Sequence, residues 1–268
     1  MIPSSPADDG AAAFVALAGR LADAAGAVLR RHFRTGAAIE FKDDASPVTA
    51  ADREAEAAMR ALLAAEVPGH GILGEEQGSE RGDADYVWVL DPIDGTKSFV
   101  TGKPTFGTLI ALAHHGRPVL GIIDQPVLAE RWVGVVGRAT LFNGRPARVR
   151  PCRGLASAWL YATSPHMFRG DDATAFERLR GRVRHAVYGA DCYAYGLLAI
   201  GLVDLVVEAD LKPYDFCALV PVVAGAGGVI GDWSGRPLKL ASEGRVVAAG
   251  DSSLHAAALR TLAGGRGG

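Results

Sequence analysis

Two aspartates and a threonine follow a strongly apolar segment near residue 90. Residues 86–90 are aromatic and β-branched, which predicts a buried strand. A proline and a glycine come next and predict a turn, so Asp91 and Asp94 should project together from the end of this strand. Two such carboxylates repel unless a cation lies between them, and their oxygen atoms suit Mg²⁺ or Mn²⁺ better than zinc. The amides of Gly95 and Thr96 could then face a phosphate group.

The simpler alternative is that these aspartates only cap a turn. Aspartate beside proline and glycine is common in turns, and short motifs often match by chance. Other acids bear on the choice, since Glu75 and Glu76 follow a short predicted strand and Asp215 opens a predicted helix. Each of these alone fits a solvated turn or a helix N-cap. Together with Asp91 and Asp94, they favour a shared metal and phosphate site.

The composition is that of an ordinary soluble globular protein. The 268 residues are 49% hydrophobic and 22% charged, enough for one large core or two packed lobes. A net charge of -2 and a pI near 6.4 give no basic surplus, so neither a nucleic acid nor a membrane is an expected partner. Three widely spaced cysteines predict free thiols in a reducing compartment.

The first apolar segment is expected to pack as a helix in a cytoplasmic protein. Residues 11–29 are interrupted by Arg20 and Asp23, which makes the segment too polar for a membrane span. No basic region precedes it, as a signal peptide would require. Its apolar spacing predicts an amphipathic helix to about residue 32.

The pattern of elements predicts an α/β protein with two lobes. We expect one catalytic unit over residues 1–268, with an α+β lobe at about 1–150 that carries the metal motifs and an α/β lobe at about 151–268. The first lobe should be rich in antiparallel pairs, with a helix at 52–60 and strands at 71–76, 108–113, 119–126 and 131–136. The second should alternate strands at 158–163, 183–187, 202–208, 229–232 and 246–249 with helices at 174–180, 192–200, 213–226 and 252–262.

These motifs resemble the inositol monophosphatase family of Mg²⁺-dependent, lithium-sensitive phosphatases. The resemblance covers nearly the whole chain in the expected order, and Tyr214 stands where most members have tryptophan before the aspartate. It implies a layered αβαβα sandwich of the inositol monophosphatase and sugar phosphatase type, and a homodimer. The matching segments are Gly74-Glu75-Glu76, residues 88–96, Tyr214-Asp215 and residues 225–228.

The resemblance also implies the metal ligands. Glu75, Asp91 and the Ile93 carbonyl would hold a first ion, while Asp91, Asp94 and Asp215 would hold a second. Asp91 would bridge them. The site would take two or three Mg²⁺ ions, with Mn²⁺ able to substitute.

A catalytic set is implied in the same way. Glu75 and Thr96 would orient the water that attacks phosphorus, and Asp52 would support Thr96 by a hydrogen bond. These roles suit phosphoryl transfer, which needs charge neutralisation and an aligned nucleophile. The residues that match the mobile loop of relatives are Lys42, Asp43 and Asp44.

The substrate must be chosen by the second half of the chain. Residues 189–196 and 206–215 resemble the histidinol-phosphatase branch, whereas inositol-specific relatives usually have Gly-Thr or Gly-Ser with Ala where this chain has Ala190 and Asp191. Histidinol phosphate carries an ammonium and an imidazole, and carboxylates recognise such groups. Asp191 and Glu208 match substrate-contacting positions, although Asp191 could instead be a helix N-cap. Either Tyr193 or Tyr195 could lie against the imidazole, or both could be core residues.

The expected function is hydrolysis of L-histidinol phosphate to L-histidinol and phosphate, a step of histidine biosynthesis. The substrate is a small phosphate monoester, bound by Gly95, Thr96, Asp191 and Glu208. One alternative is an inositol-1-phosphate phosphatase or a broad sugar or nucleotide phosphatase. An alternative of another class is a catalytically silent module that binds metal or phosphate, which the complete set of acids disfavours.

Overall fold

The computed structural model describes residues 6–36, 39–41 and 47–264. The elements up to residue 146 are α1 (Pro6–His32), β1 (Ile39–Phe41), β2 (Pro47–Thr49), α2 (Ala50–Glu66), β3 (Gly71–Gly74), β4 (Gly78–Glu80), β5 (Tyr86–Asp94), α3 (Thr96–Val100), β6 (Gly107–His114), β7 (Arg117–Gln125), β8 (Glu130–Val135), β9 (Leu141–Phe142) and β10 (Arg145–Pro146). Those that follow are η1 (Leu155–Ser157), β11 (Trp159–Ala162), η2 (Pro165–Met167), α4 (Asp171–Arg180), β12 (His185–Tyr188), α5 (Asp191–Ala199), β13 (Leu205–Glu208), α6 (Pro213–Phe216), α7 (Leu219–Gly225), β14 (Val229–Asp232), β15 (Val246–Ala249) and α8 (Ser252–Leu262).

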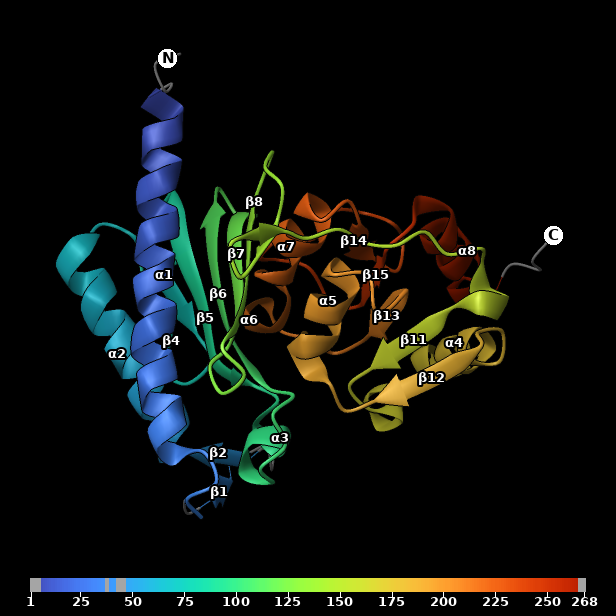
Figure 1. Cartoon of the computed structure of the whole chain (residues 1–268), viewed down its shortest axis with the longest axis horizontal. Coiled ribbons are helices and arrows are strands. Elements are labelled where there is room, and N and C mark those ends of the chain that lie inside the picture. Colours follow the sequence, from blue (N-terminus) through green and yellow to red (C-terminus); the bar gives the residue numbers. More distant parts are fainter. Residues whose placement is uncertain (1–5, 37–38, 42–46, 265–268) are drawn as a thin grey trace.

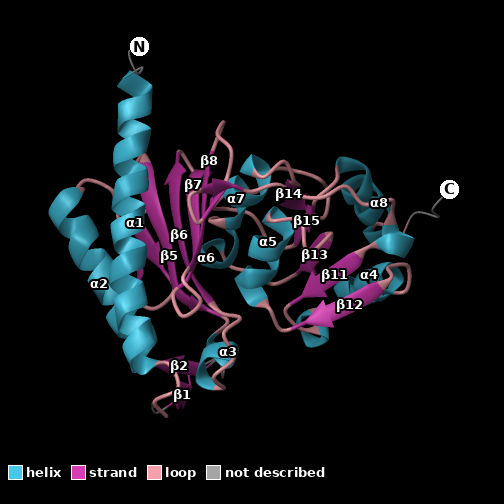
Figure 2. Cartoon of the chain, viewed as in Figure 1, coloured by secondary structure: helices cyan, strands magenta, loops and turns pink. Residues whose placement is uncertain are grey.

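Helices and sheets alternate in five layers (Figures 1 and 2). Helices α1 and α2 cover one face of the first sheet, and α5 and α7 lie between the two sheets. Helices α4 and α8 cover the outer face of the second sheet. This arrangement confirms the expected αβαβα sandwich.

The first sheet is mostly antiparallel, as expected. Its eight strands run in the order β10-β9-β8-β7-β6-β5-β3-β4, and only the β3–β5 pair is parallel among the strands described. The second sheet has five strands in the order β12-β11-β13-β15-β14. Strand β11 pairs in parallel with β12 and β13, while β15 pairs antiparallel with both of its neighbours.

Strand β5 lies between two cores, which explains its continuous apolar sequence. Val87 and Val89 pack into the core between the sheets, whereas Trp88 and Leu90 pack under α1 and α2. Successive side chains of a strand point to opposite faces, so Asp91 continues the face of Val89. Its carboxylate is therefore directed toward the central layer.

Strand β5 is longer than the sequence predicts. It continues through Pro92 to Asp94, and its register with β6 shifts between Asp91 and Asp94. A proline is tolerated at such an irregularity because its missing N–H removes no regular ladder bond there. The strand therefore ends later than the expected Leu90, while the turn lies at Gly95, which has a left-handed backbone with φ of 89°.

Other boundaries also differ from the expectations. The helix expected over residues 213–226 is divided into α6 and α7, because Pro221 has no N–H to donate to the carbonyl of Cys217. Strands β1, β2, β4, β9 and β10 were not expected, since two or three residues carry no readable alternation.

Helix α1 packs its apolar face against α2 and the first sheet. Leu21, Ala25 and Leu29 are fully buried there. By length and composition, however, residues 10–32 could cross a membrane, so the expectation that Arg20 and Asp23 make this segment too polar is wrong. Much of the apolar face is instead used in the core.

Helix α7 and the residues that join it to α6 approach the first sheet very closely. A Cβ atom at Gly121 of β7 would overlap the backbone of Ala218, which lies between α6 and α7. A Cβ at Gly134 of β8 would likewise overlap the backbone of Pro221. The absent side chains let the helix lie directly on the strands, and Asp215 is placed with it.

We expect Gly121→Ala to lower the free energy of unfolding by about 1–3 kcal/mol, because the added methyl must displace the backbone before α7. Urea unfolding of the purified protein measures this change. Gly69→Ala is the matched control, since no atom lies within 4 Å of a Cβ there. Equal stability of the two variants would contradict the close packing of α7.

Candidate active site

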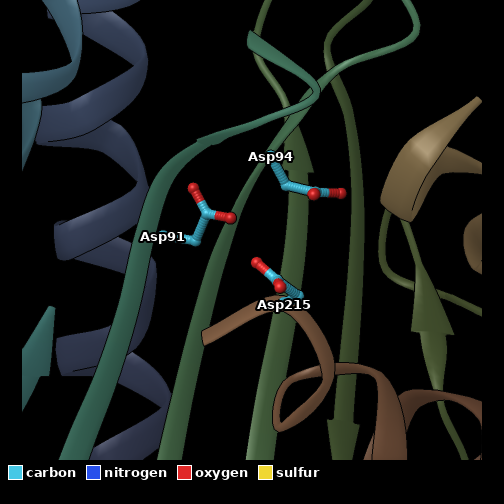
Figure 3. A group of neighbouring side chains, drawn as sticks. All are labelled: Asp91, Asp94 and Asp215. Atoms are coloured by element: carbon cyan, nitrogen blue, oxygen red, sulfur yellow. The ribbon is translucent and has the colours of Figure 1, made fainter. Parts of the chain in front are cut away.

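Three aspartates from two distant parts of the chain meet at one place (Figure 3). Asp91 and Asp94 lie on β5, and Asp215 lies on α6. Each offers one carboxylate oxygen to a group whose atoms all lie within 4.8 Å of one another. Asp91 is only 1% exposed, so the cluster is closed off from solvent on the side of β5.

Each aspartate of the cluster is held by a backbone amide. In each case one carboxylate oxygen accepts an N–H bond, and Asp91 has a further side-chain hydrogen bond with Glu75. Asp215 is the third residue of α6, whose N-cap is Lys212, so the N-cap interpretation is wrong for Asp215. Its carboxylate instead closes a capping box by accepting from the N-cap amide. The donor-to-acceptor distances are 3.0 Å from Ile93 N to Asp91 Oδ1, 2.5 Å from Cys192 N to Asp94 Oδ2 and 2.6 Å from Lys212 N to Asp215 Oδ2.

The cluster resists carrying its full negative charge. Burial raises the pKa of Asp91 and of Asp94 well above the ordinary value, and neighbouring carboxylates add to the shift. Burial, with the charges of Glu75 and Glu208, raises the pKa of Asp215 to about 7. Such a set is most stable when protons or a cation offset the repulsion.

Glu75 adds a fourth carboxylate from the neighbouring strand end. It follows β3, and its amide donates to Leu90 O at 3.1 Å. Its charge contributes to the raised pKa of both Asp91 and Asp215. The structure therefore brings Glu75 to the edge of the cluster, as the sequence predicts.

The hydrogen bond expected between Thr96 and Asp52 is not formed. The Thr96 hydroxyl donates to Ile93 O at 3.1 Å. Asp52 Oδ2 instead accepts from Thr49 N at 2.8 Å and from Thr49 Oγ1 at 2.7 Å. Asp52 Oδ1 is buried and has no partner among the residues described. The cause is local, because Asp52 is the third residue of α2 and closes a capping box with Thr49.

A small cavity lies beside the cluster. Its volume is about 110 Å³, and it is bounded mainly by α5, the end of β13 and α6. It contains the two carboxylates that were expected to select the substrate. The lining residues are Asp94, Thr163, Met167, Asp191, Cys192, Tyr195, Glu208, Leu211, Asp215 and Leu219.

Asp191 is the first residue of α5, not its N-cap. The cap position is Ala190, and no side chain caps the helix. Asp191 has a left-handed backbone with φ of 47°, and Ser98 Oγ donates to its Oδ2 at 3.3 Å. Burial raises the pKa of Asp191, while the Ser98 hydroxyl and the Lys103 ammonium oppose this shift. The N-cap alternative for Asp191 is therefore wrong.

Glu208 is a buried carboxylate with ordered neighbours. Its Oε1 accepts from Thr163 N at 2.9 Å and from Thr163 Oγ1 at 2.6 Å. Its Oε2 accepts from the Tyr195 hydroxyl at 2.9 Å. Burial raises the pKa of Glu208 to about 7 despite these donors. One acceptor position of Oε2 is left for a further donor.

The two tyrosines of α5 have different surroundings. Tyr195 is fully buried and borders the cavity. Tyr193 donates to Glu130 Oε2 at 2.6 Å and packs edge-on against Trp132 at 5.7 Å. Tyr193 is thus a packing residue, whereas Tyr195 acts on the cavity through Glu208.

Several partners of the site were not found from the sequence. Thr105 Oγ1 donates to Gly189 O at 3.1 Å, and Lys103 Nζ donates to the same carbonyl. Ser98 and Thr163 were missed as well. These contacts join residues dozens of positions apart, and no local pattern signals them. The predicted loop residues Lys42, Asp43 and Asp44 lie outside the described residues.

A larger cavity lies elsewhere in the described part of the chain. It measures about 840 Å³ and is bounded by α4, the end of α8 and residues 232–245, with none of the clustered aspartates. Its charges largely pair among themselves, as Arg245 with Asp172 and Arg236 with Asp232. The acidic cluster, not cavity size, therefore marks the candidate active site.

Comparison with known proteins identifies the family. The inositol monophosphatase family model matches residues 12–264. The chain belongs to the inositol monophosphatase family. It is 53% identical to Bifunctional phosphatase IMPL2, chloroplastic, of Arabidopsis thaliana, over 97% of this chain and 78% of that protein. It is 34% identical to a Histidinol-phosphatase of Chlorobaculum parvum, over 87% of this chain and 90% of that protein.

A solved structure gives the same answer. An inositol monophosphatase from Zymomonas mobilis has a TM-score of 0.87 and 50% identity, covering 97% of this chain and 100% of that one. The chain is accordingly a phosphatase of the inositol monophosphatase family, whose members depend on metal. Asp91, Asp94 and Asp215 fit that requirement, because they converge as oxygen donors and their charges repel one another.

The metal-free protein should lose stability as the pH rises. A carboxylate whose pKa is raised on folding stabilises the fold below its ordinary pKa, and that contribution is lost as the pH rises through about 7 for Asp215 and Glu208. We expect a lower melting temperature at about pH 8 than at about pH 5.5 in chelator, and a smaller gap for Asp215→Asn. Saturating Mg²⁺ should narrow the wild-type gap. An identical pH profile for wild type and variant would contradict this account.

The variant Asp94→Asn should remove the charge of this side chain while keeping its packing. The amide oxygen of the introduced side chain could still accept from Cys192 N, so the fold should remain. Turnover should fall roughly a hundredfold or more, because a ligand charge is lost. The melting temperature in chelator should rise, since one repelling charge is gone. Asp83→Asn, at an exposed position, is the control. Unchanged turnover of Asp94→Asn at saturating Mg²⁺ would sink the assignment.

Proposed function

We propose that this chain is a Mg²⁺-dependent phosphomonoesterase that hydrolyses L-histidinol phosphate to L-histidinol and phosphate. The observation that carries the proposal is the cavity beside the aspartate cluster. Asp191 and Glu208 line it together with Asp94 and Asp215. Of these four carboxylates, Asp94 and Asp215 belong to the metal and phosphate site. Asp191 and Glu208 are therefore available to bind another part of the substrate.

The chemistry of the substrate matches these extra carboxylates. Histidinol phosphate has an ammonium and an imidazole beside its phosphate ester, whereas inositol phosphate has hydroxyls. Charge-assisted hydrogen bonds to carboxylates are roughly twice as strong as neutral ones. Glu208 has acceptor capacity left on Oε2, and Asp191 accepts a long bond from Ser98 on Oδ2 and also contacts the Thr163 hydroxyl. We assign the two nitrogen groups of the substrate to these carboxylates.

The named relatives support this choice without deciding it. A relative that covers most of this chain is a histidinol-phosphatase, and the more similar plant relative is a bifunctional phosphatase. The inositol monophosphatase from Zymomonas mobilis favours the rival, an inositol-1-phosphate phosphatase. In that case Asp191 would serve the structure only.

Mg²⁺ is the proposed metal because all donors are hard oxygen atoms. Glu75, Asp91, the Ile93 carbonyl, Asp94 and Asp215 would hold it. When bound, it would offset the negative charge of the phosphate and lower the pKa of a bound water.

The residues of the chain then align the reaction. The Thr96 hydroxyl donates a hydrogen bond to Ile93 O, so its oxygen can accept a hydrogen bond from the attacking water. Glu75 would accept the other O–H, which directs a lone pair of the water toward phosphorus. The amides of Gly95 and Thr96 would face the phosphate. The new P–O bond would form to the water oxygen as the ester P–O bond breaks. The proton that Glu75 takes from the water balances the proton that the leaving alcohol oxygen gains, and the second water proton stays on the released phosphate.

A phosphate-release assay tests the proposal. We expect kcat/KM to be highest for histidinol phosphate among four esters, the others being inositol 1-phosphate, fructose 1,6-bisphosphate and adenosine 3′,5′-bisphosphate. Chelator should abolish release. A higher kcat/KM for inositol 1-phosphate would overturn the substrate assignment, and no release from any ester would favour the silent binding module.

A matched pair of variants tests the role of Asp191. Asp191 and Asp210 both have left-handed backbones, with φ of 47° and 61°, and asparagine tolerates that conformation. Asp191→Asn should reduce kcat/KM for histidinol phosphate by roughly tenfold or more, through loss of a charged acceptor. Its preference for histidinol phosphate over inositol 1-phosphate should fall as well. Asp210→Asn should change neither, because Asp210 is exposed and pairs with Lys212.

A further inference from the structure

A second buried carboxylate lies behind the turn that carries Glu75. Glu56 of α2 is fully buried and is not part of the aspartate cluster. Its Oε2 accepts from Glu76 N at 2.8 Å, and its Oε1 accepts from Gln77 N at 3.1 Å. These two amides directly follow Glu75, so Glu56 holds the backbone on one side of that residue.

Arg60 completes the contact one helical turn later. Its Nε donates to Glu56 Oε1 at 2.8 Å, and its Nη2 donates to Gly78 O at 2.6 Å. The pair therefore binds both the amides and a carbonyl of the connection between β3 and β4. Two side chains on one face of α2 thus bind the polar backbone groups of the whole turn.

The helix and the turn lie so close that no side chain fits between them. A Cβ atom at Gly74 would overlap Glu56 Oε1 and lie 2.8 Å from Arg60 Nη2. Gly74 also pairs with Gly78 in the β3–β4 ladder. The residue before Glu75 must be glycine for the carboxylate of Glu56 to reach the turn.

The contacts of Glu56 with the turn oppose an electrostatic repulsion. The charge of Glu75 helps to raise the pKa of Asp91 and of Asp215, so these carboxylates repel one another. Without an anchor, the turn would relax away from the cluster. The amide of Glu75 is tied to Leu90 O at 3.1 Å, and the next two amides are tied to Glu56. Glu75 is thus fixed from both sides.

We propose that Glu56, together with Arg60, is a positioning residue that holds Glu75 at the metal and water site. The proposal rests on the function proposed above. A carboxylate is required at this position, because only two acceptor oxygens can serve two successive amides and a guanidinium at once. Glutamine offers a single acceptor oxygen, so one of the two amides would lose its partner.

The test is a double-mutant cycle between Glu56→Gln and Glu75→Gln. We expect Glu56→Gln to lower kcat by roughly tenfold through misplacement of Glu75, with KM for histidinol phosphate changed less than about twofold. The same variant should weaken Mg²⁺ binding several-fold by titration calorimetry. In the Glu75→Gln background, adding Glu56→Gln should cause no further loss of either quantity.

Controls separate positioning from general stability. Glu54→Gln changes an exposed residue of the same helix, which pairs with His32, and should leave kcat and Mg²⁺ affinity unchanged. Arg60→Lys keeps a charge beside Glu56 but gives up the fork that also reaches Gly78 O, so it should cause a smaller loss in the same direction. This variant decides the question if Glu56→Gln does not fold.

Two results would overturn the proposal. One is an equal loss from Glu56→Gln in the wild-type and Glu75→Gln backgrounds, which would show that Glu56 acts independently of Glu75. The other is wild-type kcat and Mg²⁺ affinity in Glu56→Gln. If the wild-type protein releases phosphate from none of the esters, the proposed function fails, and the calorimetric cycle alone decides on Glu56.

Discussion

Repulsion between buried carboxylates is the constraint on which the rest of this structure depends. The clustered oxygen atoms lie within 4.8 Å of one another, and two unit charges at about 5 Å repel by about 3 kcal/mol at an effective dielectric constant near 20. Burial adds to this cost, as the raised pKa of each aspartate records. The fold must therefore hold each carboxylate from behind. It does so with backbone amides, each of which fixes one carboxylate oxygen.

These amides come from different layers. The amide that holds Asp91 belongs to its own strand, that of Asp215 to the start of its own helix, and that of Asp94 to α5. The cluster is consequently complete only when the central helices lie correctly on the first sheet. The close contact of Gly121 with the backbone before α7 sets that placement. The geometry of the carboxylates at the end of β5 thus depends on how the central helices pack against β7.

The sequence predicts the local parts of this arrangement well. Strand β5 is apolar on both faces because it lies between two cores, and this signal is contained in five consecutive residues. The ends of α4, α5 and α8 fall within about three residues of expectation, as is usual for pattern-based boundaries. What could not be predicted depends on long-range geometry. Ser98 reaches Asp191 across 93 positions, and nothing near Ser98 signals it. The failed Thr96–Asp52 bond is the opposite case, because a local capping box between Thr49 and Asp52 takes up one oxygen of the Asp52 carboxylate.

The hydrogen bond from Cys192 N to Asp94 separates the part of this segment that holds the aspartate cluster from the part that faces the cavity. The amide that fixes Asp94 belongs to the residue directly after Asp191, so the backbone of this segment cannot move without disturbing the cluster. The Asp191 side chain does not cap α5, and its hydrogen-bond partners are the hydroxyls of Ser98 and Thr163. A substitution at position 191 would therefore change what the cavity presents to a substrate while the amide of Cys192 stays in place. Family relatives named for histidinol and for inositol phosphates are consistent with this division. Under the proposed function, backbone contacts hold the carboxylates that perform the reaction, and the side chain of Asp191 is free to differ between phosphatases of different substrate preference.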